Sequence, residues 1–300
     1  MRFDEELNYK EVCRELNDDE VNSGKGRNLQ LEKWQEEYNV EKVGRGKYII
    51  HNALSQEERQ DKKDKKNYAA FLQATLLKYL SQSKNITTVY TYKELREHLA
   101  MVNSNYFPVK YYNESIELDM PKDYPEDIAD AMKRIWFDNA DGHDEDAIKY
   151  ALRKISDARL ITMKESHVFY KEVKIDDGFV SYPAHLATDE EESRFLQISA
   201  DYLESVGCRN IRDLFAKGKE IRNGYYKALL DYLATIGYDR YAKAFVVTRA
   251  AELERVANYF APEFNKAQVT RYLGSKRFKT IPPFIHEQMV DKLIKIKEEG

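Results

Sequence analysis

The first 50 residues repeat their apolar side chains at helical spacing twice. Between residues 9 and 16, steps of three and four mark one face of a short amphipathic helix with Tyr9, Val12, Cys13 and Leu16. A polar break over 17–26 follows. From 27 to 39 the same spacing predicts a second helix, whose apolar face carries Leu31, Trp34 and Tyr38.

A strand pattern comes next. β-branched and aromatic residues between 38 and 50 flank Gly44-Arg45-Gly46 and predict a tight β-hairpin. Two helices followed by a hairpin are the elements of a winged helix-turn-helix, in which the second helix enters the major groove of DNA. We therefore predict a domain of this kind over residues 1–54.

The remaining chain divides into three parts. Residues 55–67 hold no large apolar residue and form either a charged linker or the exposed start of the next helix. Over 68–185, helical stripes precede a second predicted hairpin around Lys164–His167, which favours a central winged-helix-like domain. From 186 to 300 the pattern is almost wholly helical, with joints at Gly207, Gly218, Gly237 and Pro262.

The predicted fold class is mainly α with short β-hairpins. It comprises an N-terminal winged helix-turn-helix, a second winged-helix-like domain and a C-terminal helical bundle. The apolar stripe of the bundle, such as Leu229, Leu230, Leu233 and Ile236, makes either its core or a homodimer contact. A two-fold dimer would suit a winged-helix protein because it reads paired half-sites.

Composition narrows the setting. Lys and Arg number 48 and Asp and Glu 52, so the net charge is -4. This balance argues against a protein coated in basic charge, but it allows local basic surfaces. Cys13 and Cys208 lie far apart without a CxxC spacing, so neither a disulfide framework nor a zinc site is indicated. Without a long apolar run for a membrane span, we expect a cytoplasmic protein.

The first domain places basic and amide side chains where DNA would lie. Arg reads guanine edges and Asn or Gln reads adenine edges from the start of a recognition helix, while basic residues at a wing contact phosphates. The predicted DNA-binding residues are Lys25, Arg27, Asn28, Gln30, Lys33, Lys42, Arg45 and Lys47. The competing interpretation is a plain turn and a solvated helix face. The acidic residues of the same helix, Glu32, Glu36 and Glu37, support that alternative.

The C-terminal half is basic as well. Its basic residues form either a second DNA surface or, as we favour, the solvated faces of the helical bundle. The residues concerned are Arg209, Arg212, Lys219, Arg222, Lys276, Arg277 and Lys279.

Several segments together resemble the small winged-helix modules at the N-termini of proteins from phages and mobile elements of low-GC Gram-positive bacteria. The segments are Tyr9–Cys13, the turn Ser23–Gly26, Gln30–Trp34, the wing end Gly46–Ile50, and Thr91–Leu95 followed by Met101–Tyr106. The resemblance covers about residues 5–110. It implies a DNA-binding protein of such an element, either a regulator or a replication accessory.

Enzymatic motifs are absent from the sequence. It contains no phosphate-binding loop, dinucleotide fingerprint, zinc-protease motif or serine-hydrolase motif. Carboxylates gather only in Asp138–Asp146, with which a nuclease would hold Mg²⁺, but the spacing fails the EF-hand register. The simpler interpretation is a loop between two helices, with acids at the start of the second. We therefore predict no catalytic residue, no metal site and no cofactor.

The predicted function is sequence-preferring binding of double-stranded DNA. Transcriptional regulation of a phage or mobile element ranks first, and an accessory role in replication or partition at an origin ranks second. A different class is a protein-interaction module that inhibits or recruits a host or phage protein. The acidic stretch over 105–150 and the net charge favour this third reading.

Overall fold

A computed structural model describes residues 1–112, 116, 118–121, 124–174, 180–215, 217–260, 278 and 280–294. The chain forms two compact units. Unit 1 contains residues 1–71, 124–143 and 270–286, and unit 2 contains residues 72–123, 144–269 and 287–300. Among the helices of the described residues, none combines the length and the apolar character that a membrane crossing requires.

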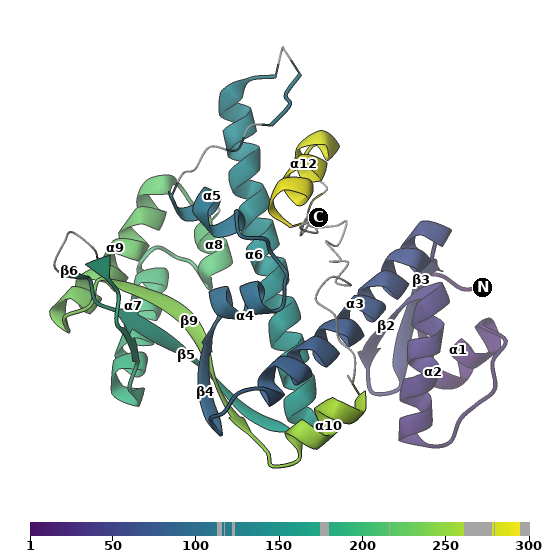
Figure 1. The fold of residues 1–300 in the computed structure, drawn as a ribbon. Coiled ribbons are helices and arrows are strands. Elements are labelled where there is room, and N and C mark those ends of the chain that lie inside the picture. Colours follow the sequence, from purple (N-terminus) through teal and green to yellow (C-terminus); the bar gives the residue numbers. More distant parts are fainter. Residues whose placement is uncertain are drawn as a thin grey trace, which may run out of the picture. The chain divides into compact units, whose positions relative to one another are not determined.

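The predicted fold class, mainly α with short hairpins, is wrong. Unit 2 contains a four-stranded antiparallel sheet with the strand order β4-β9-β5-β8 (Figure 1). Its two central strands, β5 (Ile161–Tyr170) and β9 (Arg240–Arg249), are ten residues long each. The protein is therefore a mixture of helices and sheet.

Local chemistry explains the elements of the N-terminal part. Strand β1 (Glu6–Asn8) leads into helix α1 (Tyr9–Glu15). Asn8 is the N-cap of this helix and forms a capping box with Glu11. Ser23 caps helix α2 (Gly24–Glu37) by accepting from the Gly26 amide. Strands β2 (Tyr38–Gly44) and β3 (Lys47–Ala53) form the hairpin, and β1 pairs with β3 in a three-stranded antiparallel sheet. We call residues 1–54 the N-terminal module.

The module has its own core. Its buried residues come from both helices and all three strands: Leu7, Tyr9, Val12, Cys13, Trp34, Val40, Tyr48 and Ile50. The indole Nε1 of Trp34 donates to Asp18 Oδ2 at 2.8 Å, which ties the loop between the helices to α2. Although partial burial works in the opposite direction, hydrogen bonds from Gln30 and Trp34 hold the pKa of the Asp18 carboxyl below its usual value.

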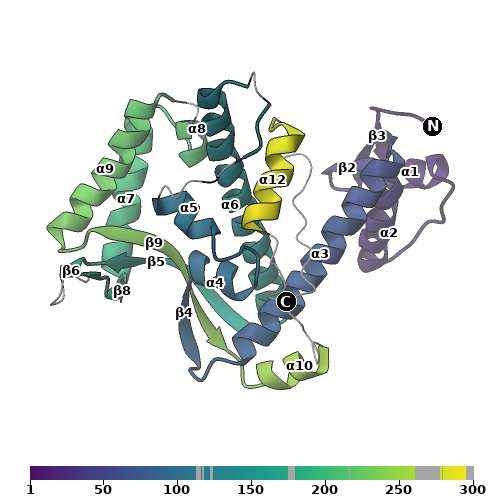
Figure 2. The same cartoon turned by 45° about the horizontal axis from the view of Figure 1, so that its top comes forward.

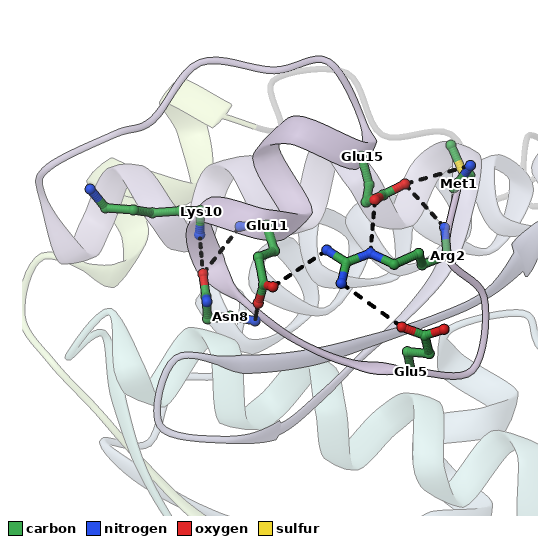
Figure 3. Close-up of polar contacts among 7 residues, drawn as sticks. All are labelled: Met1, Arg2, Glu5, Asn8, Lys10, Glu11 and Glu15. Atoms are coloured by element: carbon green, nitrogen blue, oxygen red, sulfur yellow. Dashed lines mark hydrogen bonds and ion pairs between the residues drawn. The ribbon is translucent and has the colours of Figure 1, made fainter.

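The chain before β1 is fastened to α1 by Arg2. Figure 3 shows its guanidinium facing the carboxylates of Glu15, Glu11 and Glu5. The nitrogen–oxygen distances to these three residues are 2.9 Å, 3.4 Å and 3.9 Å. The hydrogen bond to Glu15 is the main reason that the pKa of Arg2 is raised. Because Arg2 and Glu5 are exposed and Glu11 and Glu15 are only half-buried, the contacts orient the segment more than they stabilise it.

Helix α3 (Gln56–Ser81) begins within the charged segment, so residues 56–67 are the start of a helix and not a linker. The next elements are β4 (Thr87–Thr91), α4 (Tyr92–His98) and α5 (Tyr106–Tyr112). Helix α6 (Glu126–Asp157) runs without a break through the predicted loop over 138–143. Ala, Met and Ile residues on both sides of that stretch favour a helix, and the acidic residues face outward or find partners.

The second predicted hairpin is also wrong. Residues 161–170 form one strand, β5, which pairs along its whole length with β9 and places Ile161 opposite Arg249 and Tyr170 opposite Arg240. Residues 240–249 lie in the region predicted to be helical, but the aromatic and β-branched run Phe245–Thr248 suits a strand between two neighbours. Strand β8 (Ala184–Leu186) completes the sheet, and β6 (Val173–Lys174) pairs with β7 (Val180–Ser181).

Three helices pack beside this sheet. Helix α7 (Asp189–Ser205) lies against helix α9 (Lys219–Thr235), with the short α8 (Ile211–Phe215) between them in sequence (Figure 2). Their shared core contains Phe169, Phe195, Leu214, Tyr225, Leu229 and Leu233. Among the described residues, the remaining helices are α10 (Leu253–Phe260) and α12 (Pro283–Leu293).

Candidate nucleic-acid interface

The hairpin tip and the first half of α2 lie at the same end of the N-terminal module. Lys47, next to the tip, pairs with Asn8, and the following residue, Tyr9, carries the guanidinium of Arg27 4.4 Å from its ring centre. At the opposite end Tyr38 pairs with Ala53, and the Leu54 amide donates to the Glu37 carbonyl at the end of α2. Strand β2 therefore runs antiparallel to α2.

Four predicted DNA-binding residues are exposed at this end. Lys25 and Asn28 lie on the outer side of α2, and Lys42 and Arg45 lie on the hairpin. Within the part of the chain that the structure describes, none of the four forms an ion pair or a side-chain hydrogen bond. Their polar groups are therefore available to a ligand. Gly46, with a φ of 73°, supplies the left-handed residue that the two-residue turn around Arg45 requires.

The structure corrects the role of Gln30. Its side chain is buried, accepts a hydrogen bond from the Tyr9 hydroxyl and donates to the Asp19 carbonyl at 2.6 Å. The Tyr9 hydroxyl in turn accepts from the Val21 amide at 2.7 Å, and burial raises the pKa of Tyr9. Gln30 thus joins both helices and their connecting loop, and it does not present its amide to a base.

Arg27 is held in a similar way. Its Nε donates to the Val21 carbonyl at 2.8 Å while the guanidinium lies over the Tyr9 ring. The side chain is exposed but packs against its own module. In this conformation Arg27 does not extend towards a guanine base, as the prediction required.

Two further predicted residues are paired with acids. Lys33 lies 3.4 Å from Asp18, and Lys47 lies 2.5 Å from Glu6. Lys47 and Glu6 are both exposed, and Lys33 is exposed beside the half-buried Asp18, so either lysine can exchange its partner for a phosphate at little cost.

The acidic residues of α2 follow its outer side towards the C-terminus. Glu36 pairs with Lys66 of α3 at 3.1 Å, and Lys62 of α3 donates to the Gln35 carbonyl. Glu32 and Glu37 are exposed. Because α3 meets α2 at this end, the acidic end of α2 is the one next to α3, whereas the basic end is next to the hairpin tip.

The second basic set is only partly described. Arg209 and Lys219 are exposed in unit 2, Arg222 is half-buried, and Arg212 lies in α8. Lys276, Arg277 and Lys279 lie outside the described residues.

The acidic segment Asp138–Asp146 lies within helix α6. Asp144 is fully buried in α6, and its Oδ2 accepts from Nε of Arg96 at 2.7 Å, while Arg96 lies 4.3 Å from the ring centre of Tyr106. Helical geometry turns Asp146 about 200° away from Asp144. Among the described residues, no group of three or more His, Cys, Asp and Glu side chains is placed to hold a metal ion.

Charged side chains join helix α6 to the four-stranded sheet of unit 2 in a cluster that sequence patterns did not indicate. Lys243 lies 3.0 Å and Lys149 lies 3.1 Å from the carboxylate of Glu145, and Lys149 also lies 2.7 Å from Glu165. Although burial works in the opposite direction, Lys243 and Lys149 hold the pKa of Glu145 below its usual value. The members are separated by up to 98 residues, so no local spacing could have revealed the cluster.

A second cluster lies beside β5 at Ser166 and His167, just past the residues that pair with β8. The Glu192 carboxylate accepts from the His167 amide at 2.9 Å and from Ser166 Oγ at 3.0 Å, and it lies 2.7 Å from His167 Nδ1. The first contact replaces a ladder hydrogen bond where β8 has ended. We interpret this cluster as structural.

Comparisons with known proteins do not assign this chain to a family. No family model, no curated protein and no solved structure matches this chain.

Proposed function

We propose that the protein binds double-stranded DNA through the hairpin-tip end of the N-terminal module. The observation that carries this proposal is the set of four exposed, uncommitted polar side chains, Lys25, Asn28, Lys42 and Arg45, on one helix and the hairpin that follows it. Three are cationic, and Asn28 is of the type that pairs with adenine.

The order of elements supports the same proposal. A short helix, a longer helix with a basic start and a hairpin are the parts that a winged helix-turn-helix uses on DNA. In this arrangement α2 would lie in the major groove with Lys25 and Asn28 foremost, and Lys42 and Arg45 would contact phosphates of the flanking backbone.

The net charge of the module decides how strong the binding will be. Residues 1–54 contain nine basic and twelve acidic residues, which gives 9 − 12 = −3. A surface of this kind does not bind polyanions everywhere, so binding depends on a few contacts at one end. We therefore expect moderate affinity, a shallow salt dependence and a preference for sequence.

The test is the salt dependence of binding to a duplex selected from a random pool by the full-length protein. Lys42→Gln with Arg45→Gln should reduce the slope of log K against log salt concentration by about 1.8, because each lost phosphate contact removes about 0.9. Lys63→Gln with Lys65→Gln on α3 is the control, since it removes the same charge from exposed residues away from the tip. Equal slopes for the two double variants would refute the proposal.

A second candidate function rests on exposed apolar residues beside the same side chains. Leu29 of α2 is 58% exposed and Val43 of the hairpin is 41% exposed. Such residues favour a protein partner. Leu29→Asn with Val43→Thr would then abolish co-purification of that partner from nuclease-treated lysate while Lys42→Gln with Arg45→Gln would not. DNA binding predicts that the basic variant has the larger effect on duplex affinity.

The predicted roles in transcription or at an origin stay predictions. Identification of the selected duplex sequence within the parent genome would separate them.

A further inference from the structure

The four-stranded sheet of unit 2 ends at strand β4, which has a neighbouring strand on one side only. In the order β4-β9-β5-β8, β4 pairs antiparallel with β9 and with no other strand of the described residues. Figure 2 shows β4 at the margin of the sheet, beside β9. The backbone groups on the outer side of β4 are therefore left for solvent or for another chain.

The register with β9 shows which backbone groups of β4 point outward. The Arg249 amide donates to the Ile86 carbonyl at 2.9 Å, so these two residues form a hydrogen-bonded pair of the antiparallel ladder. Because such pairs alternate along a strand, Thr87 and Val89 direct their amides and carbonyls away from β9. Within the part of the chain that the structure describes, these groups form no hydrogen bond. The amide of Thr91, the next residue in the alternation, is engaged in the capping box of α4.

The two margins of the sheet differ in their side chains. Where β8 has ended, β5 carries the charged Lys164 and Glu165, and the Glu192 carboxylate accepts from the His167 amide. Charged side chains of this kind keep a sheet edge from pairing with another chain. Residues 86–91, along β4, contain no charge and no proline, and all six are β-branched or aromatic. This composition is typical of a segment that pairs with a copy of itself.

The free groups of β4 are complementary to those of a second β4. An antiparallel pairing about a two-fold axis at Thr88 places Thr87 opposite Val89 of the second copy. Each such pair exchanges two hydrogen bonds, and the symmetry creates two pairs, so every free amide and carbonyl of both residues is used. Two free residues separated by one position are what a two-fold axis through the residue between them requires.

The same register covers an exposed apolar side chain. Ile86 is 69% exposed and would lie opposite Tyr90 of the second copy. The interface is nevertheless small, and association has to offset the loss of translational and rotational freedom. We therefore expect a dimer that dissociates on dilution.

We propose that β4 is the interface of a symmetric homodimer, in which two copies of the strand pair antiparallel about Thr88. The two four-stranded sheets would then form one continuous sheet of eight strands. This inference does not depend on DNA binding, because the interface lies in unit 2. If the N-terminal module does bind DNA, the dimer carries two modules, as paired half-sites require.

The first test is sedimentation equilibrium of the full-length protein over a range of concentrations. The mass of the wild type should rise towards twice the 35.3 kDa of one chain. Ile86→Lys with Thr87→Lys adds the charges that protect an edge and should hold the mass at one chain throughout. Leu196→Lys with Thr235→Lys, at exposed positions of α7 and α9, is the charge-matched control and should dimerise like the wild type.

The second test examines the register by cross-linking. Thr88→Cys should form a disulfide-linked dimer on mild oxidation, because side chains that face each other across the axis have Cβ atoms about 4.5–5.5 Å apart. Thr87→Cys should cross-link much more slowly, since its counterpart in the second copy lies on a diagonal of about 7–8 Å. Both native cysteines, Cys13 and Cys208, are buried. Non-reducing electrophoresis measures the covalent dimer.

Three results would overturn the proposal. The first is a wild type that keeps the mass of one chain at concentrations up to about 1 mM. The second is an Ile86→Lys with Thr87→Lys variant that dimerises like its control, because another surface would then hold the dimer. The third is cross-linking of Thr87→Cys that is as fast as that of Thr88→Cys. Thermal unfolding of both lysine variants should match that of the wild type, because all four substituted residues are exposed.

Discussion

The N-terminal module and the sheet of unit 2 contrast in how far apart their partners lie in sequence. In the module, β2 and β3 are joined by a two-residue turn, and α1, α2 and the strands share one core within 54 residues. In unit 2, β9 pairs on one side with β4, more than 150 residues away, and on the other with β5. The N-terminal module is built from contacts between residues that are close in sequence, whereas the sheet of unit 2 is built from segments that are distant in sequence.

This difference determines which groups of polar residues a sequence pattern can reveal. In the module, the exposed side chains lie close to each other in sequence, so a pattern could suggest a site. In unit 2, two of the ion pairs that join elements link residues 48 and 98 positions apart: Arg96–Asp144 and Glu145–Lys243. Loss of one distant partner should therefore harm unit 2 more than loss of any single polar contact harms the module.

The largest expected effect is at Asp144. Asp144→Ala leaves the guanidinium of Arg96 buried without this carboxylate and should lower the free energy of unfolding by about 3–5 kcal/mol. Alanine is compatible with the middle of α6, so helix propensity does not confound the result. Urea denaturation measures it. In the double variant Asp144→Leu with Arg96→Met most of the stability should return, and a double variant as unstable as Asp144→Ala would contradict this account.

The next effect sharpens the comparison inside the module. Gln30→Ala removes the acceptor of the Tyr9 hydroxyl and the donor to the Asp19 carbonyl, and should lower the free energy of unfolding by about 1–3 kcal/mol. The salt slope of DNA binding should stay at the wild-type value. If Gln30→Ala instead kept its stability and lost base preference, the side chain would be a reader of DNA after all.

A smaller effect is expected where α7 meets α9. Gly224→Ala places a methyl group against Tyr202 and should lower the free energy of unfolding by about 1–2 kcal/mol, since overpacking outweighs the gain in helix propensity of about 1 kcal/mol. Combining it with Tyr202→Phe should recover part of the loss, because the hydroxyl is the nearest atom. A stabilised Gly224→Ala would show that the two helices separate easily.

The smallest effect concerns pH. His51 lies 2.7 Å from Asp4 and 3.3 Å from Glu41, and the hydrogen bond to Asp4, followed by that to Glu41, raises the pKa of His51. Protonated His51 therefore stabilises the module fully below the unfolded-state value of about 6.5, and this contribution is lost as the pH rises through the folded-state pKa. An NMR titration should place the pKa of His51 above 6.5. Denaturation of the wild type over that pH range should show a slight fall in stability that His51→Gln lacks. A titration below 6.5 would contradict the assignment.

Local chemistry accounts for what could be predicted from the sequence. The spacing of Tyr9, Val12, Cys13 and Trp34 specified two helices, and the Gly-flanked Arg45 specified the hairpin, because each depends on neighbours within a few residues. The exposure of Lys25, Asn28, Lys42 and Arg45 follows from the same periodicity. Gln30 could not be assigned in this way, since a glutamine on a helix has no sequence signal that tells a buried hydrogen-bonded amide from an exposed one.

Tertiary structure alone decided the rest. Residues 161–170 form one continuous strand, and residues 240–249 form another in place of a helix, because each supplies the hydrogen-bonding partner of the other along its whole length. The same holds for the continuous α6, whose buried Asp144 accepts a hydrogen bond from Arg96 of α4, 48 residues away. The sequence by itself determined the two helices and the hairpin of the N-terminal module, whose residues contact others nearby in the sequence. The fold determined the sheet with its free edge at β4 and the buried ion pair, because burial and pairing at a distance depend on which segments meet.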